Sequence, residues 1–231
     1  MDQLLIALDV DSSSRALELS DRLQSVAGGF KIGSQLFTAH GPSFIRQMSD
    51  RGHLILLDLK YHDIPNTVAG AVRAAADMGV WMVTVHASGG HEMMAAAKEA
   101  AARDPGGPLI VAVTVLTSFD ESALAGLGIS RSVPEQVVAL ASQAQDAGVD
   151  GVVASPLEIA LIRARCGPEF IIVTPGIRNL ETDAINDQAR TMDAAGALRA
   201  GADYLVVGRP IIAADDPLAA AVQITEGIGQ A

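Results

Sequence analysis

The sequence predicts an α/β fold: a single (β/α)8 TIM barrel that spans residues 1–231. Short apolar runs rich in β-branched residues recur eight times, and Ala-rich segments with apolar residues at helical spacing lie between them. Strands that alternate with helices, mostly at intervals of roughly 20–35 residues, indicate a parallel sheet with crossover helices, and eight strands fit a closed barrel. An open doubly wound sheet is the alternative. The turn after the first strand, Asp9-Val10-Asp11-Ser12, is not the glycine-rich dinucleotide fingerprint of such sheets.

The elements follow in order along the chain. The expected strands are residues 4–10, 30–32, 54–59, 81–86, 109–116, 151–154, 170–174 and 204–207. The expected helices include residues 13–26, 66–78, 133–147 and 192–200. Gly79, Gly148 and Gly201 are placed to end helices just before the next strand. Because no linker or shift in composition divides the chain, we expect one domain.

Composition excludes several classes of function. Hydrophobic residues make up 49% of the chain, enough for a large core, but only 3% are aromatic, so Ala, Val, Leu and Ile must build that core. A net charge of −11, with no run of Lys and Arg, disfavours nucleic acid as a partner. Cys166 is the only cysteine, which argues against a disulfide framework or a thiolate metal cluster. Without a basic leader or a long apolar run, we expect a cytoplasmic protein with no membrane partner.

The most informative motif is Asp58-x-Lys60-x-x-Asp63, which begins where the third apolar run ends. Side chains two apart on a strand share a face, so Asp58 and Lys60 should point the same way. Carboxylates beside Lys60 would keep its ammonium charged, which suits a proton donor to a carbanion and not a Schiff-base nucleophile. The alternative is a structural ion-pair cluster, with Asp63 serving the start of a helix that Pro65 opens.

Two further motifs predict an anion site and a lid. Gly208-Arg209 follows the last strand, where barrels of this class commonly bind phosphate, and Arg209 can bind two phosphate oxygens at once. A surface arginine after a turn is the alternative. The segment from Thr174 to Gln188 is long and polar without a clear helix, which indicates an active-site lid or a solvated excursion.

A metal site is not expected from the spacing of the ligand-type residues. His86 ends the fourth strand, where a single histidine is more often a hydrogen-bonded structural residue than a ligand. Asp58, Asp63 and His86 together offer Mg²⁺ ligands in principle, but Lys60 competes for the two carboxylates.

Asp58 and the run Lys60-Tyr61-His62-Asp63-Ile64-Pro65-Asn66-Thr67 resemble the signature of the orotidine 5′-monophosphate decarboxylases. Six other motifs agree with this family in the same order: Leu8-Asp9-Val10, Phe30-Lys31-Ile32-Gly33, Val85-His86-Ala87-Ser88-Gly89-Gly90, Val115-Leu116-Thr117-Ser118, Thr174-Pro175-Gly176-Ile177-Arg178 and Val207-Gly208-Arg209-Pro210. The resemblance extends from Asp9 to Pro210. It implies a dimeric (β/α)8 barrel that converts orotidine 5′-monophosphate to uridine 5′-monophosphate and CO₂ without a metal or an organic cofactor.

The resemblance also implies roles for individual residues. Lys60 would protonate C6 as the carboxylate departs, Asp58 would lie beside that carboxylate, and Asp63 would reach in from the other subunit. The implied substrate-binding residues are Asp9 and Lys31 at the ribose hydroxyls, Thr67 at the ribose from the other subunit, Thr117 and Ser118 at the pyrimidine, Arg178, Gln188, Gly208 and Arg209 at the phosphate, and Ile64 and Pro175.

Two other functions stay open at this point. A Mg²⁺-dependent 3-keto-gulonate 6-phosphate decarboxylase or hexulose phosphate synthase shares the Asp-x-Lys-x-x-Asp core and a phosphate site. The runs from Ile64 to Thr67 and Thr117-Ser118 favour the pyrimidine nucleotide instead. A barrel of another class would bind a phosphorylated metabolite without catalysis, although a pure binder has no need of a lysine between two acids.

Overall fold

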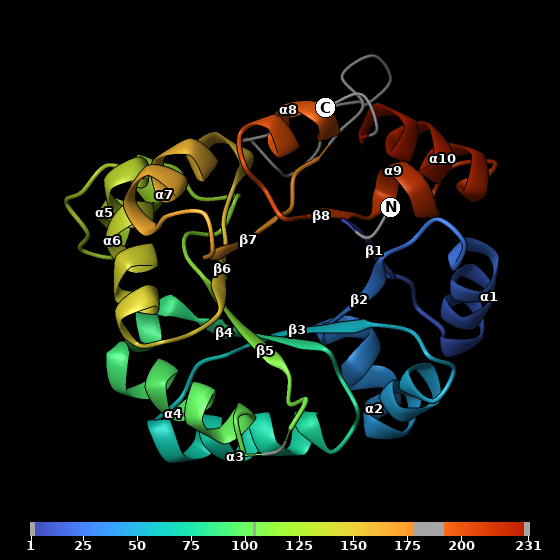
Figure 1. Ribbon diagram of the computed structural model, residues 1–231, viewed down its shortest axis with the longest axis horizontal. Helices are drawn as coiled ribbons and strands as arrows, with labels where there is room; N and C mark the ends of the chain where they lie inside the picture. Colours follow the sequence, from blue (N-terminus) through green and yellow to red (C-terminus); the bar gives the residue numbers. More distant parts are fainter. Residues whose placement is uncertain (1–2, 104, 178–191, 229–231) are drawn as a thin grey trace.

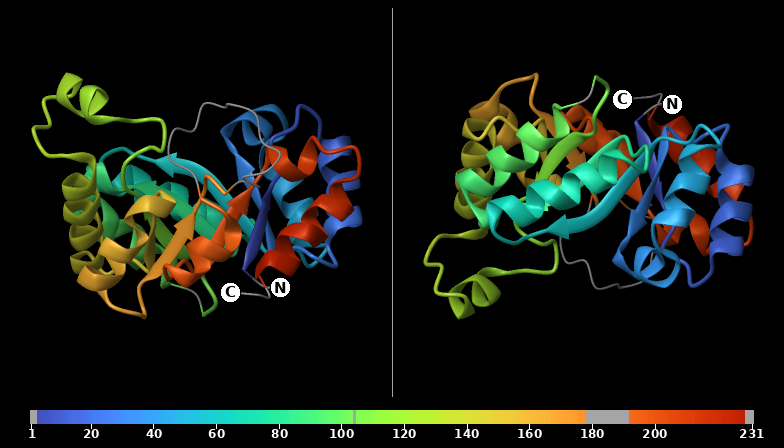
Figure 2. Two further views of the ribbon diagram at one scale, coloured as in Figure 1. Left: turned by 90° about the horizontal axis from the view of Figure 1, so that it is seen from above. Right: turned by 90° about the horizontal axis from the view of Figure 1, so that it is seen from below.

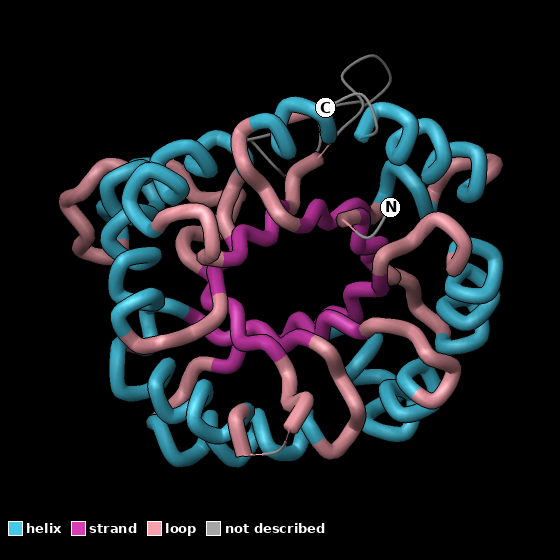
Figure 3. Tube along the Cα trace, in the orientation of Figure 1, coloured by secondary structure: helices cyan, strands magenta, loops and turns pink. Residues whose placement is uncertain are grey.

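The computed structural model describes residues 3–103, 105–177 and 192–228, and it contains a closed barrel of eight parallel strands in the order β1 to β8. Figure 3 shows the strands as a ring enclosed by helices. The strands are β1 (Leu4–Ala7), β2 (Gly29–Gly33), β3 (Ile55–Tyr61), β4 (Met82–His86), β5 (Leu109–Val113), β6 (Gly151–Val153), β7 (Ile171–Thr174) and β8 (Tyr204–Val207). The predicted (β/α)8 barrel is therefore confirmed.

Two strands end three residues before the apolar runs that predicted them do. The run over residues 4–10 leaves the sheet after Ala7, and the run over residues 109–116 leaves it after Val113. Leu8 and Val115, which follow the ends of these strands, nevertheless stay buried. The apolar run extends beyond the last paired residue of each of these strands, so the apolar pattern overestimates strand length.

The helices form the outer layer of the barrel (Figure 1). They are α1 (Ser13–Leu23), α2 (Ser34–Ser49), α3 (Pro65–Ala76), α4 (His91–Ala101), α5 (Glu121–Gly126), α6 (Val133–Asp146), α7 (Ile159–Cys166), α8 (Ala194–Arg199), α9 (Arg209–Ile212) and α10 (Pro217–Ile228), with 3₁₀ turns η1 (Ala87–Gly89) and η2 (Pro156–Glu158). The four helices named from the sequence correspond to α1, α3, α6 and α8. Gly79, Gly148 and Gly201 follow helices with φ of 75°, 77° and 108°, as predicted. Among the described residues, no helix combines the length and apolar character that a bilayer crossing requires.

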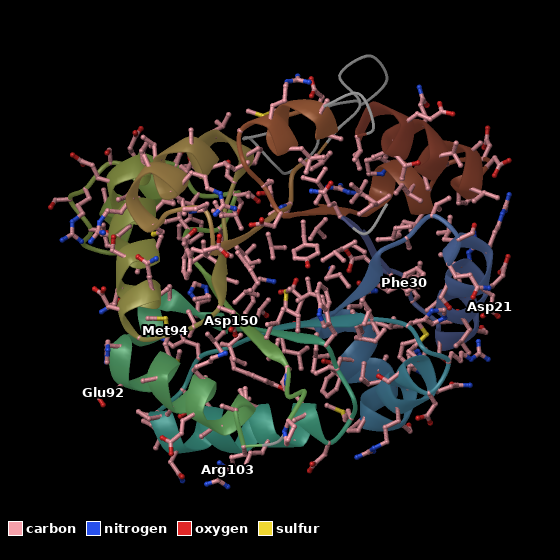
Figure 4. The ribbon with its side chains drawn as sticks, viewed as in Figure 1. Asp21, Phe30, Glu92, Met94, Arg103 and Asp150 are labelled. Carbon is pink, nitrogen blue, oxygen red and sulfur yellow. The ribbon has the colours of Figure 1, made fainter. Side chains whose placement is uncertain are left out.

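The apolar core has two parts. Inside the barrel, buried side chains from five strands pack together: Leu5, Leu56, Met82, Val111 and Val173. A larger cluster fills the layer between strands and helices, where Phe30 and Met94 are almost fully buried, whereas Glu92 and Arg103 point outward (Figure 4). The described interior of the barrel is therefore a packed core and not a pore.

One connection stands apart from the ring of helices. Figure 2 shows α5 projecting away from the barrel wall between β5 and α6. The connection from β5 to α5 contains Thr117 and Ser118, the predicted pyrimidine-binding residues.

Candidate active site

A cavity of about 500 Å³ opens at the carboxyl ends of the strands. Its apolar lining includes Ala7, Leu56 and Val173 from the barrel interior. Nine of the predicted site residues line it as well: Asp9, Lys31, Asp58, Lys60, Thr117, Ser118, Pro175, Gly208 and Arg209. Residues far apart in the sequence therefore meet at the end of the barrel where such folds carry their chemistry.

Charges of alternating sign run across this cavity. Lys31 Nζ donates to Asp9 Oδ1 at 2.6 Å and lies 4.0 Å from Asp58 Oδ2. Lys60 Nζ donates to both carboxylate oxygens of Asp58 at 2.9 Å. Lys31 is only 8% exposed, so its ammonium depends on these carboxylates for the solvation that water would otherwise provide. The row Asp9, Lys31, Asp58, Lys60 is electrically balanced before any ligand enters.

A bulge in β3 brings Asp58 and Lys60 together. Leu57 pairs with Val83 and Tyr61 pairs with Val85, so three residues of β3 lie opposite one residue of β4. Lys60 has φ of 53°, and it is the only non-glycine residue with positive φ in the described part of the chain. Such a conformation costs roughly 1–3 kcal/mol and persists only where the surroundings impose it. The predicted meeting of the two side chains is confirmed, but regular strand alternation is not its cause.

Asp63, Ile64 and Thr67 lie outside the cavity. All three are exposed, and Asp63 Oδ1 accepts a hydrogen bond from the Ile64 backbone N–H at 2.6 Å. Helix α3 begins at Pro65 with Ile64 as its N-cap and without a capping side chain, so Asp63 does not serve the helix start directly. In the part of the chain that the structure describes, the ion pairs of Lys60 include Asp58 and not Asp63.

Two of the predicted phosphate residues, Gly208 and Arg209, lie where β8 is followed by α9. Gly208 approaches β1 closely, since a Cβ atom added there would lie 3.3 Å from Ala7 Cβ. Arg209 opens α9 and is exposed at the rim of the cavity. It also lines a second, more open hollow of about 430 Å³ beside the start of α1. Arg178, Gln188 and the rest of residues 178–188 in the segment predicted as a lid lie outside the described residues.

The sequence analysis missed Thr84 on β4. This residue lines the cavity, is 1% exposed and contacts both Lys60 and Asp58. Its only sequence signal is a hydroxyl in the middle of the apolar strand 81–86, which by itself does not distinguish a site residue from a packed threonine.

The surroundings of His86 favour its neutral imidazole form. Its ring stacks on His62 with the centroids 5.4 Å apart, and its Nδ1 lies 2.9 Å from Ser88 Oγ. Burial lowers the pKa of His86 below its ordinary value, and the neighbouring His62 and Lys60 lower it further. His86 is thus a hydrogen-bonded residue beside the charged row.

Other reactive groups have no arrangement for metal or thiolate chemistry. Within residues 3–103, 105–177 and 192–228, no three His, Cys, Asp or Glu side chains are grouped to hold a metal ion. Cys166 on α7 is buried, and burial raises the pKa of its thiol, which disfavours the thiolate.

Comparison with known proteins gives a consistent result. The profile described as "Orotidine 5'-phosphate decarboxylase / HUMPS family" matches residues 2–224. The chain is 53% identical over 233 residues to a protein named orotidine 5′-phosphate decarboxylase from Moorella thermoacetica, covering 98% of this chain and 92% of that protein. A protein of the same name from Pseudoalteromonas translucida is 50% identical, covering 98% and 97%. The crystal structure of orotidine 5′-phosphate decarboxylase from Lactobacillus acidophilus superposes with a TM-score of 0.85 at 35% identity, covering 98% of each chain.

Proposed function

The chain belongs to the orotidine 5′-phosphate decarboxylase/HUMPS family, and we propose from this that it decarboxylates orotidine 5′-monophosphate to uridine 5′-monophosphate and CO₂. This reaction is the last step of de novo UMP synthesis, here assigned to a cytoplasmic enzyme that uses no metal or organic cofactor. The observation that carries the proposal is the row of charges that ends with Lys60 on Asp58 inside a cavity of nucleotide-compatible size.

Lys60 acts as the cation and the proton donor. Loss of CO₂ leaves electron density at C6 of the pyrimidine, which the ring carbonyls delocalise poorly. A preorganised ammonium stabilises that density and then supplies the proton. The two hydrogen bonds that Lys60 Nζ donates to Asp58 fix the position of the ammonium at the cavity. Asp58 would lie beside the substrate carboxylate.

The remaining cavity residues bind the ribose, the pyrimidine and the phosphate of the nucleotide. Asp9 and Lys31, already joined at 2.6 Å, hold ribose hydroxyls. Thr117 and Ser118, in the connection after β5, bind the edge of the pyrimidine. The phosphate is held by Gly208 and Arg209, together with Arg178 and Gln188, and Pro175 adds a further contact. Ile64 lies outside this cavity, and its substrate contact is assigned from the family resemblance. Phosphate contacts are remote from C6, so their binding energy serves closure and desolvation of the site.

A second copy of the chain completes the site. Residues 62–67 are all exposed, and the Ile64 side chain is 67% exposed, which is unusual for an isoleucine and fits a covered surface in a homodimer. From this segment Asp63 and Thr67 would reach the neighbouring active site, Asp63 toward Lys60 and Thr67 toward the ribose.

A substrate panel tests this function. The protein is assayed with orotidine 5′-monophosphate, with orotidine lacking the phosphate, and with 3-keto-gulonate 6-phosphate and hexulose phosphate substrates in the presence and absence of Mg²⁺. We expect efficient turnover of orotidine 5′-monophosphate, a much lower kcat/KM for orotidine, and no turnover of the sugar phosphates. Turnover of a sugar phosphate that depends on Mg²⁺ would reassign the cavity, and binding of uridine 5′-monophosphate without any turnover would indicate a non-catalytic barrel.

A further inference from the structure

We propose that Thr84 is a positioning residue whose single hydroxyl holds the Lys60 backbone and the Asp58 carboxylate in one rigid unit. The inference rests on the proposed function, because the unit it holds is the proposed proton donor and its partner. Thr84 does not act on the substrate itself. It acts through Lys60 and Asp58.

The Thr84 hydroxyl uses its donor and an acceptor position at the same time. Its Oγ1 accepts a hydrogen bond from the Lys60 backbone N–H at 2.8 Å and donates one to Asp58 Oδ1 at 3.1 Å. The residue is 1% exposed, so water cannot readily replace either bond. A buried backbone N–H without a partner is destabilising, which makes the first bond important for the local conformation.

The strand register explains why a side chain, and not a backbone carbonyl, accepts the hydrogen bond from the Lys60 N–H. Between the pairs Leu57–Val83 and Tyr61–Val85, Thr84 is the one β4 residue that faces the β3 bulge of residues 58–60. A regular ladder would satisfy the Lys60 N–H with a backbone carbonyl. In the bulge the Thr84 hydroxyl does so instead, and it thereby stabilises the positive φ of Lys60.

The contacts close a ring that fixes Lys60 at both ends. The Lys60 backbone binds Thr84 Oγ1, Thr84 Oγ1 binds Asp58 Oδ1, and both Asp58 oxygens bind Lys60 Nζ. A serine can make the same two bonds, whereas a valine of similar shape can make neither. Displacement of a reacting group by about 1 Å can cost 10²-fold in rate, so loss of this ring should lower turnover far more than binding.

The test compares Thr84→Val and Thr84→Ser with a matched control, Thr114→Val. Thr114 is also a buried threonine near the end of the neighbouring strand, but its hydroxyl donates to the Val153 backbone carbonyl at 2.9 Å and does not touch the charged row. With orotidine 5′-monophosphate we expect Thr84→Val to lower kcat about 10²-fold, with KM and product affinity within about threefold. Thr84→Ser should stay within about threefold of wild type, as should Thr114→Val.

Amide hydrogen exchange at Lys60 gives a readout that does not depend on the reaction. We expect exchange of this N–H to accelerate in Thr84→Val and to remain slow in Thr84→Ser. Equal kcat in Thr84→Val and Thr114→Val, or unchanged Lys60 exchange in Thr84→Val, would overturn the inference. Thr84→Ala replaces the valine variant if valine prevents folding. A wild-type protein that leaves the nucleotide unchanged would refute the proposed function, and the exchange rate alone would then decide whether Thr84 positions Lys60.

Discussion

The Lys60 ammonium lies at the same distance, 2.9 Å, from both carboxylate oxygens of Asp58. A symmetric contact of this kind holds the nitrogen on the axis of the carboxylate, at a point fixed by two bonds. Charge-assisted bonds are stronger than neutral ones, so the ammonium is well ordered before substrate arrives. This pair is the element on which the proposed reaction depends, and the first prediction concerns it.

Replacement of Lys60 by alanine should abolish turnover. The ammonium supplies both electrostatic stabilisation and the proton, so kcat should fall by at least about 10⁴-fold. Product affinity, measured by calorimetry with uridine 5′-monophosphate, should persist because ribose and phosphate contacts remain. Turnover near the wild-type rate in Lys60→Ala would remove the lysine from the mechanism.

Asp63 should act in the neighbouring subunit. Asp63→Ala and Lys60→Ala should each be nearly inactive alone. When the two variants are mixed under conditions that allow subunit exchange, about a quarter of wild-type activity should appear, because half of the dimers are mixed and each mixed dimer has one intact site. If mixing restores nothing although exchange is shown to occur, Asp63 does not cross the interface.

Gly151 at the start of β6 should be intolerant of any side chain. A Cβ atom there would meet the carbonyl oxygen and Cβ of Ile171 on β7, both closer than 3.0 Å. Gly151→Ala should therefore lower the free energy of unfolding by about 3 kcal/mol or more in urea denaturation. The matched control is Gly126→Ala at the exposed end of α5, where a Cβ meets nothing within 4 Å and the expected change is below about 1 kcal/mol. Equal losses in the two variants would contradict the packing argument.

Acid should destabilise the protein in part through His86. Because the folded state lowers the pKa of His86 below 6.5, the unfolded chain binds the proton more readily. The free energy of unfolding must then decrease as pH falls from about 6.5 toward the folded-state pKa. His86→Gln should reduce this dependence, measured by denaturation at a series of pH values between about 6.5 and 5.

Burial also lowers the pKa of His53, so some dependence should remain in His86→Gln. A slope identical to wild type in His86→Gln would show that His86 does not contribute.

Much of the fold was predictable because apolar runs indicate buried strands and glycines indicate the ends of helices. The eight strands and the placement of Asp58, Lys60 and Arg209 at their carboxyl ends follow from that pattern. The conformation of Lys60 does not, because positive φ in a lysine is imposed by its partners on β4 and has no local signal. Thr84 was not predicted as a site residue for the same reason. Its role depends on which β4 residue faces the bulge, and strand register is a tertiary property. The exposed position of Asp63 became visible only with the surface of the folded chain.

The most direct test of the account is a single assay of chelator-treated protein with orotidine 5′-monophosphate. Loss of the substrate's ultraviolet absorbance and release of CO₂ are followed together. We predict rapid conversion, with one CO₂ released for each uridine 5′-monophosphate formed and no response to added Mg²⁺. No conversion by the folded protein, or conversion that requires added metal, would contradict the assignment of Lys60 as the cation and proton donor.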